Sequence, residues 1–355
     1  MATRHPVAVL GMGPRGFEHA RAVAALPERY ELKAVCDLKP ERLGAALTEL
    51  GRIGVHQVRG YSSAKEMLRR ERPEVFCFTT PPNLRLPLVE TAIAGGVKAV
   101  SYEKPMALSL AEAAKIGEVC AHAGVKQVVS HQHKFGVHWQ KVRELVASGE
   151  LGRVHTLHAN SKGWYLWYIT HLVDGVMFLN DWARGRWVVG HAHGRSKLDA
   201  DHPSPEYVMG HIGFENGVRG LFECGPLSPG REGRNEFWLN AGVWVYGTEG
   251  YAEIVVGSGW RAVTRRRGAI SGWGVAFREI EDTTEHYRLL ADWLEDESKV
   301  HPCRGEIAYH GLELSLAMIL SSLEQRTVTV PVDPAIPIVE RMCRELPGDP
   351  FVGEG

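Results

Sequence analysis

The first 130 residues alternate short apolar runs with longer amphipathic stretches. The apolar runs are rich in β-branched residues and lie at 6–11, 31–37, 74–80, 97–103 and 125–130. Stretches with helical spacing separate them, at 15–26, 40–50, 63–71, 84–95 and 109–123. Apolar strands that alternate with amphipathic helices are typical of a parallel sheet covered on both faces. We therefore predict an α/β domain with a doubly wound parallel sheet over residues 1–130.

The pattern changes after about residue 130. One helix is expected over 138–148, and residues 186–280 are mostly strand-like, with turn residues between the runs. Two more helices are expected, over 283–297 and 306–325. Residues 131–355 are therefore predicted to form an α+β domain with a large, mostly antiparallel open sheet.

One expected strand, residues 237–246, is apolar on both faces. One face carries Phe237, Leu239, Ala241, Val243 and Val245, and the other carries Trp238, Asn240, Gly242, Trp244 and Tyr246. Neither face favours water, so helices of the same domain are expected to cover one of them. A second subunit covering the other would make a homo-oligomer, a dimer or a tetramer. The alternative is a sheet sandwiched within one chain.

Composition and charge exclude some partners. The 355 residues carry a formal net charge of −1, which gives no general attraction to nucleic acid or to a membrane surface. No apolar run approaches the ~18 to 20 residues that span a bilayer, and the N-terminal stretch has no signal-peptide layout. The six cysteines are scattered without a CxxC pair, so reduced thiols in a cytoplasmic protein are expected.

A glycine-rich turn follows the first expected strand. Gly11, Gly13 and Gly16 form GxGxxG between that strand and a helix. The first glycine allows a tight turn, the second lets the backbone approach a pyrophosphate, and the third lets helix and strand pack closely. We predict a dinucleotide-binding Rossmann domain whose loop contacts the cofactor through Gly11, Gly13, Pro14, Arg15 and Gly16.

Two further segments are predicted to contact the cofactor. Asp37 ends the second strand about 20 residues after Gly16, where a carboxylate accepts hydrogen bonds from ribose hydroxyls and repels a 2′-phosphate. This favours NAD, but Arg15 and Lys39 nearby leave NADP open. The carboxyl end of the strand at 74–80 lies where such sheets bind ligands. The contacts expected there are Thr79, Thr80, Pro81 and Asn83.

The tripeptide Glu103-Lys104-Pro105 stands at the carboxyl end of the expected strand 97–103. In that position, together with the glycine loop, it closely resembles the Gfo/Idh/MocA oxidoreductase family, and the resemblance extends over nearly the whole chain. It implies an NAD(P)-dependent oxidoreductase that acts on a secondary hydroxyl or ketone of a sugar, polyol or glycoside. It also implies that Glu103 and Lys104 contact the cofactor.

The resemblance implies a histidine partner for Lys104 in the second domain. The family's frequent pattern there is Asp-x-x-x-His-x-x-Asp, and His171 and Asp174 match its last two positions. Trp167 stands where the family often has the first Asp, which removes the usual proton-relay carboxylate. On a helix, His171 and Asp174 are at i and i+3 and share a face.

These residues suggest a mechanism for alcohol oxidation. The Lys104 ammonium would bind the reacting oxygen, His171 would accept the hydroxyl proton near neutral pH, and NAD would take the hydride. Asp174 is the third candidate catalytic residue. For His171 alone, an ordinary buried core histidine is the alternative. Two rival functions stay open: redox-neutral cleavage or elimination of a glycoside with transient sugar oxidation, and a non-catalytic NAD-binding regulator.

Aromatic residues just before His171 are suited to a sugar, because C–H faces of sugars stack on rings. The predicted substrate contacts are Lys104, His133, Lys162, Trp164, Trp167 and His171. The two His-x-His pairs, at 131–133 and 191–193, have no third ligand within reach in the sequence, so no metal is predicted.

Overall fold

The computed structural model describes residues 4–230 and 237–348. The chain divides into two compact units, which are described separately below. The first unit comprises the described residues up to Ala107 together with Glu112–Gln132 and Arg278–Ile307. The second comprises Leu108–Ala111, His133–Phe277 and the described chain from Ala308.

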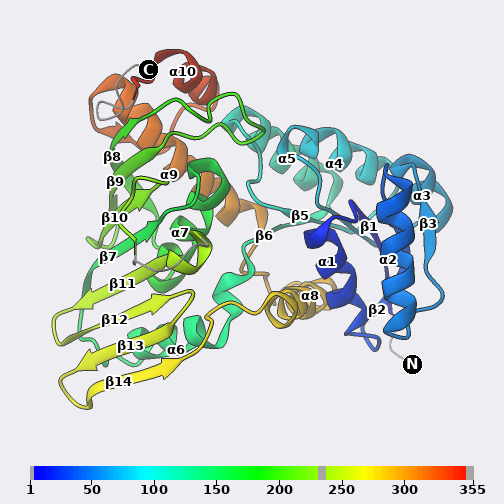
Figure 1. Ribbon diagram of the computed structural model, residues 1–355, viewed down its shortest axis with the longest axis horizontal. Coiled ribbons are helices and arrows are strands. Elements are labelled where there is room, and N and C mark those ends of the chain that lie inside the picture. The colour runs from blue at the N-terminus through cyan, green and yellow to red at the C-terminus, as the bar shows by residue number, and fades with distance from the viewer. Residues whose placement is uncertain (1–3, 231–236, 349–355) are drawn as a thin grey trace. The chain divides into compact units, whose positions relative to one another are not determined.

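The first unit is built on a six-stranded parallel sheet with the strand order β3-β2-β1-β4-β5-β6. The strands are β1 (His5–Leu10), β2 (Tyr30–Cys36), β3 (Arg59–Tyr61), β4 (Val75–Phe78), β5 (Ala99–Glu103) and β6 (Lys126–Ser130). Sheet order reverses between β1 and β4, which is the doubly wound arrangement predicted from the sequence (Figure 1). β3 was not predicted, because its three residues carry no apolar pattern.

Helices connect these strands. They are α1 (Pro14–Ala24), α2 (Pro40–Arg52), α3 (Ala64–Glu71), the 3-10 turn η1 (Pro82–Leu84), α4 (Arg85–Ala94) and α5 (Leu110–Ala123). A distant helix, α8 (Glu279–Glu295), packs against α1 (Figure 1). Its Tyr287 and Leu290 are fully buried in the core formed by β1 and β2, so this late segment completes the first unit.

The second unit contains a nine-stranded sheet with the order β14-β13-β12-β11-β7-β10-β9-β8-β15. Among the described strands of this sheet, only β7 and β10 pair in parallel, which confirms the predicted mostly antiparallel sheet. The strands are β7 (Val154–Ser161), β8 (Gly185–His193), β9 (Tyr207–Phe214), β10 (Arg219–Cys224), β11 (Gly242–Gly247), β12 (Gly250–Val255), β13 (Gly259–Thr264), β14 (Gly268–Trp273) and β15 (Val328–Thr329).

Helices cover one face of this sheet. The helical segments of the unit are η2 (Gln132–Phe135), α6 (Val137–Ala147), α7 (Tyr165–Leu179), η3 (Phe237–Asn240), α9 (Gly305–Glu324) and α10 (Ile338–Glu345). α6 packs on β12 and β13, and α7 packs on β7, β10 and β11 (Figure 1). α9 lies so close to β8 that a side chain at Gly190 would meet the Met318 carbonyl oxygen at 2.2 Å.

The other face of the sheet remains partly exposed and apolar. The side chains that show it are Trp187, Val189, Met209, Leu221, Tyr246 and Val263, each 36–39% exposed. In β11 the alternation is as predicted, because Val243 and Val245 are buried while Tyr246 is exposed.

The predicted strand over 237–246 is wrong in its first half. Residues 237–240 form the 3-10 turn η3, in which the Ala241 amide donates to the Trp238 carbonyl at 3.3 Å. The strand begins only at Gly242. Within the described residues, no helix combines the length and the apolar character that crossing a membrane requires.

Candidate functional site

The glycine loop of the first unit has the geometry that a dinucleotide needs. Gly11 has φ +91°, a left-handed conformation that favours glycine. A Cβ on Gly16 would lie 1.6 Å from the Gly11 carbonyl oxygen. A Cβ on Gly13 would meet only the Arg42 guanidinium, at 4.0 Å, so the space above it is open where α1 begins. The open helix N-terminus fits a pyrophosphate.

Gly16→Ala is expected to destabilise this loop, because its methyl group overlaps backbone that cannot move away alone. We expect a loss of about 2 kcal/mol or more in the free energy of unfolding and at least a tenfold loss of NAD affinity. Gly44→Ala, in α2, is the matched control, since nothing lies within 4 Å of its Cβ. It should leave both quantities unchanged or raise stability slightly. If thermal unfolding and NAD titration gave the same stability and the same NAD affinity for Gly16→Ala as for Gly44→Ala, this account of the loop would be wrong.

Asp37 is held rigidly beside the loop. Its Oδ2 accepts a hydrogen bond from the Met12 amide at 2.6 Å, and its Oδ1 accepts one from the Lys39 amide at 2.8 Å. Each carboxylate oxygen keeps a lone pair for a ribose hydroxyl. Arg42, which the sequence analysis did not single out, is the nearest cation to Gly13.

The segment after β4 supports the loop from the neighbouring strand. The Thr79 hydroxyl donates to the Gly11 carbonyl at 2.9 Å, so Thr79 links β4 to the glycine turn. The Thr80 carbonyl accepts a hydrogen bond from Arg85 Nη1 at 2.6 Å. Pro81 precedes η1, and Asn83 lies within it. Whether these four residues touch a cofactor stays a prediction.

Arg85 was missed by the sequence analysis. It is 1% exposed, and its guanidinium carbon lies 5.7 Å from the Phe78 ring centroid and 5.5 Å from that of Tyr102. Among the described residues no carboxylate pairs with it, and its Nε has no acceptor. Burial lowers the pKa of Arg85 to about 10. It therefore remains a cation, and it adds positive charge near Lys104.

A buried hydrogen-bond network fixes Glu103 at the end of β5. Its Oε1 accepts from Arg15 Nη2 at 2.8 Å, from Arg15 Nε at 3.0 Å and from His19 Nε2 at 3.2 Å. His19 Nδ1 lies 2.9 Å from the Tyr287 hydroxyl of α8. Burial alone would raise the pKa of Glu103, but Arg15, His19 and Lys104 outweigh it and hold that pKa well below its usual range. Glu103 is therefore a carboxylate at neutral pH.

The sequence motifs did not predict the contacts of two members of this network, Arg15 and His19. Arg15, predicted as a cofactor contact, has its guanidinium on Glu103 and Glu18. His19 was overlooked, although it lies at i+3 from Gly16 and so shares a helix face with the loop. The i+3 spacing from Gly16 was the one sequence feature that could have identified His19 as a neighbour of the loop. Nothing in the sequence near Glu103 indicates Tyr287.

Lys104 follows Glu103 at the carboxyl end of β5. Burial lowers the pKa of Lys104, the Glu103 carboxylate raises it, and Arg15 and Arg85 lower it, which leaves it at about 8. At pH 7 the ammonium then exceeds the amine about tenfold. Lys104 can therefore donate a hydrogen bond to a developing oxyanion, and it can also release a proton close to neutral pH.

His171 lies in the first half of α7 in the second unit. Its ring stacks on that of His133, with centroids 4.1 Å apart and planes 2° apart. The Tyr168 ring lies 5.5 Å from His171, and the Phe277 ring packs 4.3 Å from His133. His171 is 9% exposed. The structure thus brings together two residues that the sequence analysis proposed separately, His133 and His171.

Asp174 forms a buried ion pair one turn further along α7. Its Oδ1 lies 2.7 Å from Lys134 Nζ, and both side chains are almost fully buried. Burial raises the pKa of Asp174 to about 6, although Lys134 opposes that rise. The pair ties η2 to α7 and thereby fixes the segment that carries His133 against the helix that carries His171.

The other predicted substrate contacts are close to the start of α7. Trp164 precedes the helix, and the Lys197 ammonium lies 5.5 Å from its ring centroid. Trp167 is 45% exposed, and Lys162 is exposed as well. Asn160, buried near the end of β7, donates to the Pro229 carbonyl at 3.0 Å. Its Oδ1 has no hydrogen-bond donor in the described part of the chain, so it can accept one from a hydroxyl.

One cluster of the described residues has metal-ligand types: His286, His301 and Cys303, with ligand atoms within 4.8 Å of one another. The His301 ring is engaged on both sides, because Nδ1 accepts from the Cys303 amide at 2.9 Å and Nε2 donates to the His286 carbonyl at 3.0 Å. A metal would have to break one of these bonds. The cluster therefore fits a structural link between α8 and the loop after it better than a metal centre.

Comparison with known proteins agrees with this geometry. Residues 6–131 match the Gfo/Idh/MocA family profile, described as an oxidoreductase family with an NAD-binding Rossmann fold. The first unit is therefore an NAD-binding Rossmann domain. Over these residues the chain is similar to the Gfo/Idh/MocA oxidoreductase family, the family that its motifs resemble.

Curated relatives match part of the chain. A 1-carboxy-3-chloro-3,4-dihydroxycyclo hexa-1,5-diene dehydrogenase of Comamonas testosteroni is 26% identical over 228 residues, which cover 60% of this chain and 55% of the relative. A myo-inositol 2-dehydrogenase of Thermotoga maritima is 26% identical over 156 residues, which cover 44% and 45%. The chain thus matches about half the length of these relatives.

Solved structures match the whole fold. An NAD binding oxidoreductase from Klebsiella pneumoniae superposes with a TM-score of 0.77 at 18% identity, covering 93% of this chain and 100% of that one. A levoglucosan dehydrogenase, solved with NADH and levoglucosan, gives 0.77 at 16% identity with the same coverage. At these identities the matches establish the fold alone.

Proposed function

We propose that this protein is an NAD-dependent dehydrogenase acting on a secondary hydroxyl of a sugar or polyol, with Lys104 binding the reacting oxygen. The observation that carries the proposal is Lys104 itself, which directly follows β5, is next to the fixed carboxylate of Glu103 and has a pKa of about 8. A lysine tuned in this way suits a reacting oxygen whose charge changes during the reaction.

The roles of the individual residues follow from their chemistry. Lys104 binds the reacting oxygen and steadies its negative charge, and Glu103 keeps Lys104 protonated. His171 accepts the hydroxyl proton, and the stacked His133 ring and the Lys134–Asp174 pair hold its helix in position. NAD, when bound, supplies the hydride acceptor. Asp37 and the glycine loop favour NAD over NADP.

The substrate class is supported by the polar and aromatic groups before α7. Trp164 and Trp167 offer ring faces, while Lys162 and Asn160 offer hydrogen bonds to hydroxyls. Inositol and levoglucosan, which appear in the names of the dehydrogenases compared above, are cyclic polyhydroxy compounds. A cyclic sugar or polyol is therefore the substrate class that we propose.

Trp167 is proposed as a stacking surface for the substrate. Trp167→Ala is expected to raise KM about fivefold to tenfold with kcat nearly unchanged, because a ring contact contributes to binding rather than to bond breaking. Trp273→Ala, which removes an 81% exposed tryptophan of β14, is the matched control and should change neither constant. A Trp167→Asp enzyme that is faster at unchanged KM would instead identify position 167 as a proton-relay site.

We further propose that a second copy of the chain covers the exposed apolar face of the nine-stranded sheet. Its partly exposed side chains come from β8, β9, β10, β11 and β13 and therefore form a broad surface. Large exposed apolar surfaces of this kind favour association. The proposed assembly is a homo-oligomer.

The function is tested by a panel of sugars, inositols and glycosides, each assayed with NAD and with NADP. Nicotinamide absorbance and product are read in the same samples. We expect oxidised product together with NADH for at least one cyclic polyol. Product without net NADH would favour redox-neutral cleavage, and NAD binding without turnover of any compound would favour a regulator.

A further inference from the structure

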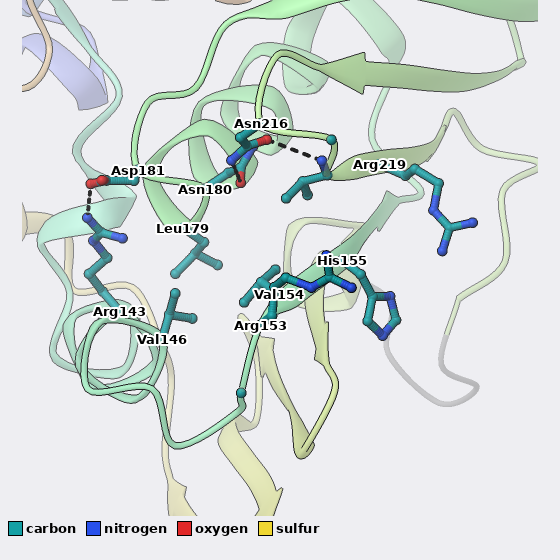
Figure 2. Close-up of a pocket in the computed structure, with 13 residues that line it drawn as sticks. Arg143, Val146, Arg153, Val154, His155, Leu179, Asn180, Asp181, Asn216 and Arg219 are labelled. Atoms are coloured by element: carbon teal, nitrogen blue, oxygen red, sulfur yellow. Dashed lines mark hydrogen bonds and ion pairs between the residues drawn. The ribbon is translucent and has the colours of Figure 1, made fainter.

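A cavity of the second unit lies away from the residues discussed so far. It has a volume of about 490 Å³ and opens between the end of α6, the start of β7, the end of α7 and the β9–β10 hairpin (Figure 2). The residue at the end of α7 that lines it, Asn180, is nine positions from His171. At 1.5 Å per residue along a helix, this separation is about 14 Å. The cavity is thus distinct from the His171 cluster.

The charged lining of this cavity is mostly basic. Arg143, Arg153 and Arg219 line it, against the single carboxylate of Asp181. Arg143 pairs with Asp181, as Figure 2 shows on one side of the cavity. Arg219 donates to the neutral Thr156 hydroxyl at 3.0 Å, and Arg153 has no ion pair within the described chain. Two guanidinium groups therefore remain without a carboxylate.

A buried amide adds an unsatisfied donor to the same cavity. Asn180 is 5% exposed, and its Oδ1 accepts from Asn216 Nδ2 at 2.9 Å. The Asn216 Oδ1 in turn accepts from the Val218 amide at 3.2 Å, which fixes the orientation of both amides. Asn180 Nδ2 is left with no acceptor in the described part of the protein. Buried N–H groups normally have a partner, so this donor points to a ligand or water that accepts from it.

Helix dipoles do not explain this arrangement. Arg143 lies before the last turn of α6, and that turn carries no basic residue. Arg153 precedes β7 and Arg219 begins β10, and neither lies in the last turn of a helix. Figure 2 shows them on the side of the cavity opposite to the Arg143–Asp181 pair. Their charge thus remains available to a bound group.

We propose that this cavity binds a small oxyanion with at least two negative charges, either a phosphate group or a polycarboxylate. Arg153 and Arg219 would bind its charged oxygens, and Asn180 Nδ2 would donate to it from the buried wall. Guanidinium groups favour both classes, because each presents two oxygens that accept paired N–H bonds.

Calorimetric titration of the intact protein tests this proposal. Inorganic phosphate and citrate are titrated separately at constant ionic strength, with NAD present so that the glycine loop is already occupied. We expect saturable binding of at least one probe, one per chain, with a Kd of about 1 mM or tighter. The Arg153→Gln/Arg219→Gln double variant and the Asn180→Asp variant should each weaken it about tenfold or more. Arg265→Gln, which changes an exposed arginine of another hairpin, is the control and should bind like the wild type.

The two probes separate the two sources of such a ligand. Phosphate binding without citrate binding indicates a phosphorylated ligand, and the reverse indicates a polycarboxylate. No saturable binding of either probe would overturn the proposal, as would binding that survives both sets of substitutions. The readout is heat of binding, so the result does not depend on whether the protein oxidises a sugar.

Discussion

Lys104→Ala and His171→Ala are each expected to lower kcat by about 10² or more, with NAD affinity close to that of the wild type. The reason is that each variant loses an interaction of the transition state: Lys104 stabilises the oxyanion, and His171 takes the proton. Steady-state kinetics with the substrate found in the panel, together with NAD titration and thermal unfolding, measures all three quantities.

Two controls match these variants in residue type. Lys98→Ala removes a surface lysine that pairs with Glu74, and His122→Ala removes an exposed histidine of α5. Both should leave kcat within a factor of about two. His171 is buried, so His171→Gln, which keeps a polar side chain of similar length, is tested as well. If both His171 variants fold and remain fully active, the catalytic role is wrong and His171 is an ordinary core residue.

The value of kcat/KM is expected to fall as pH rises above about 8, where Lys104 loses its proton. Because the Glu103 carboxylate raises the pKa of Lys104, Glu103→Gln should lower that pKa and move the alkaline limb of the pH profile to lower pH. The ammonium form would then be scarcer at pH 7, and activity there would fall.

Lys104→Arg distinguishes Lys104 from any other group that titrates near pH 8. Arginine stays charged through the whole range, so the alkaline limb should disappear even if the remaining activity is low. The measurement is a profile of kcat/KM from about pH 6 to about pH 10 for the three proteins. An alkaline limb that keeps its position in both variants would contradict the assignment to Lys104.

Much of the first unit could be predicted because its determinants are local. The GxGxxG turn, the apolar strands and Asp37 each occupy a short stretch, and the structure places them as expected. The exception is β3, whose three residues pair with β2 without an apolar pattern of their own. The role of α8 was also hidden, because its contact with α1 joins segments far apart in the chain.

For the second unit, the sequence predicted the fold class but not the bounds of every strand. Buried and more exposed residues alternate clearly in β10, yet Phe237–Asn240 forms a 3-10 turn despite an apolar sequence that suits a strand. Tertiary contacts decide such short apolar runs. One of them is the Gly257 amide, which donates to the Leu239 carbonyl at 3.0 Å and keeps this segment in a turn.

The sequence predicted individual residues of the candidate site, but it did not predict the contacts that position these residues and shift their pKa values. Lys104 and His171 were found from motifs, but the His133 stack, the Lys134–Asp174 pair and the His19–Tyr287 link each join residues distant in sequence. Spacing along one helix or strand carries no information on such partners. Arg85 was overlooked because a buried guanidinium without a carboxylate is rare in folded proteins.

The central claim is net hydride transfer to NAD, and the most direct measurement follows the hydrogen itself. A substrate from the panel, deuterated at the reacting carbon, is incubated with the enzyme and NAD, and both products are analysed by mass spectrometry. The account predicts one deuterium in the reduced nicotinamide for each ketone formed, and almost no transfer with Lys104→Ala. Product that retains its deuterium, or that forms without reduced nicotinamide, would contradict it.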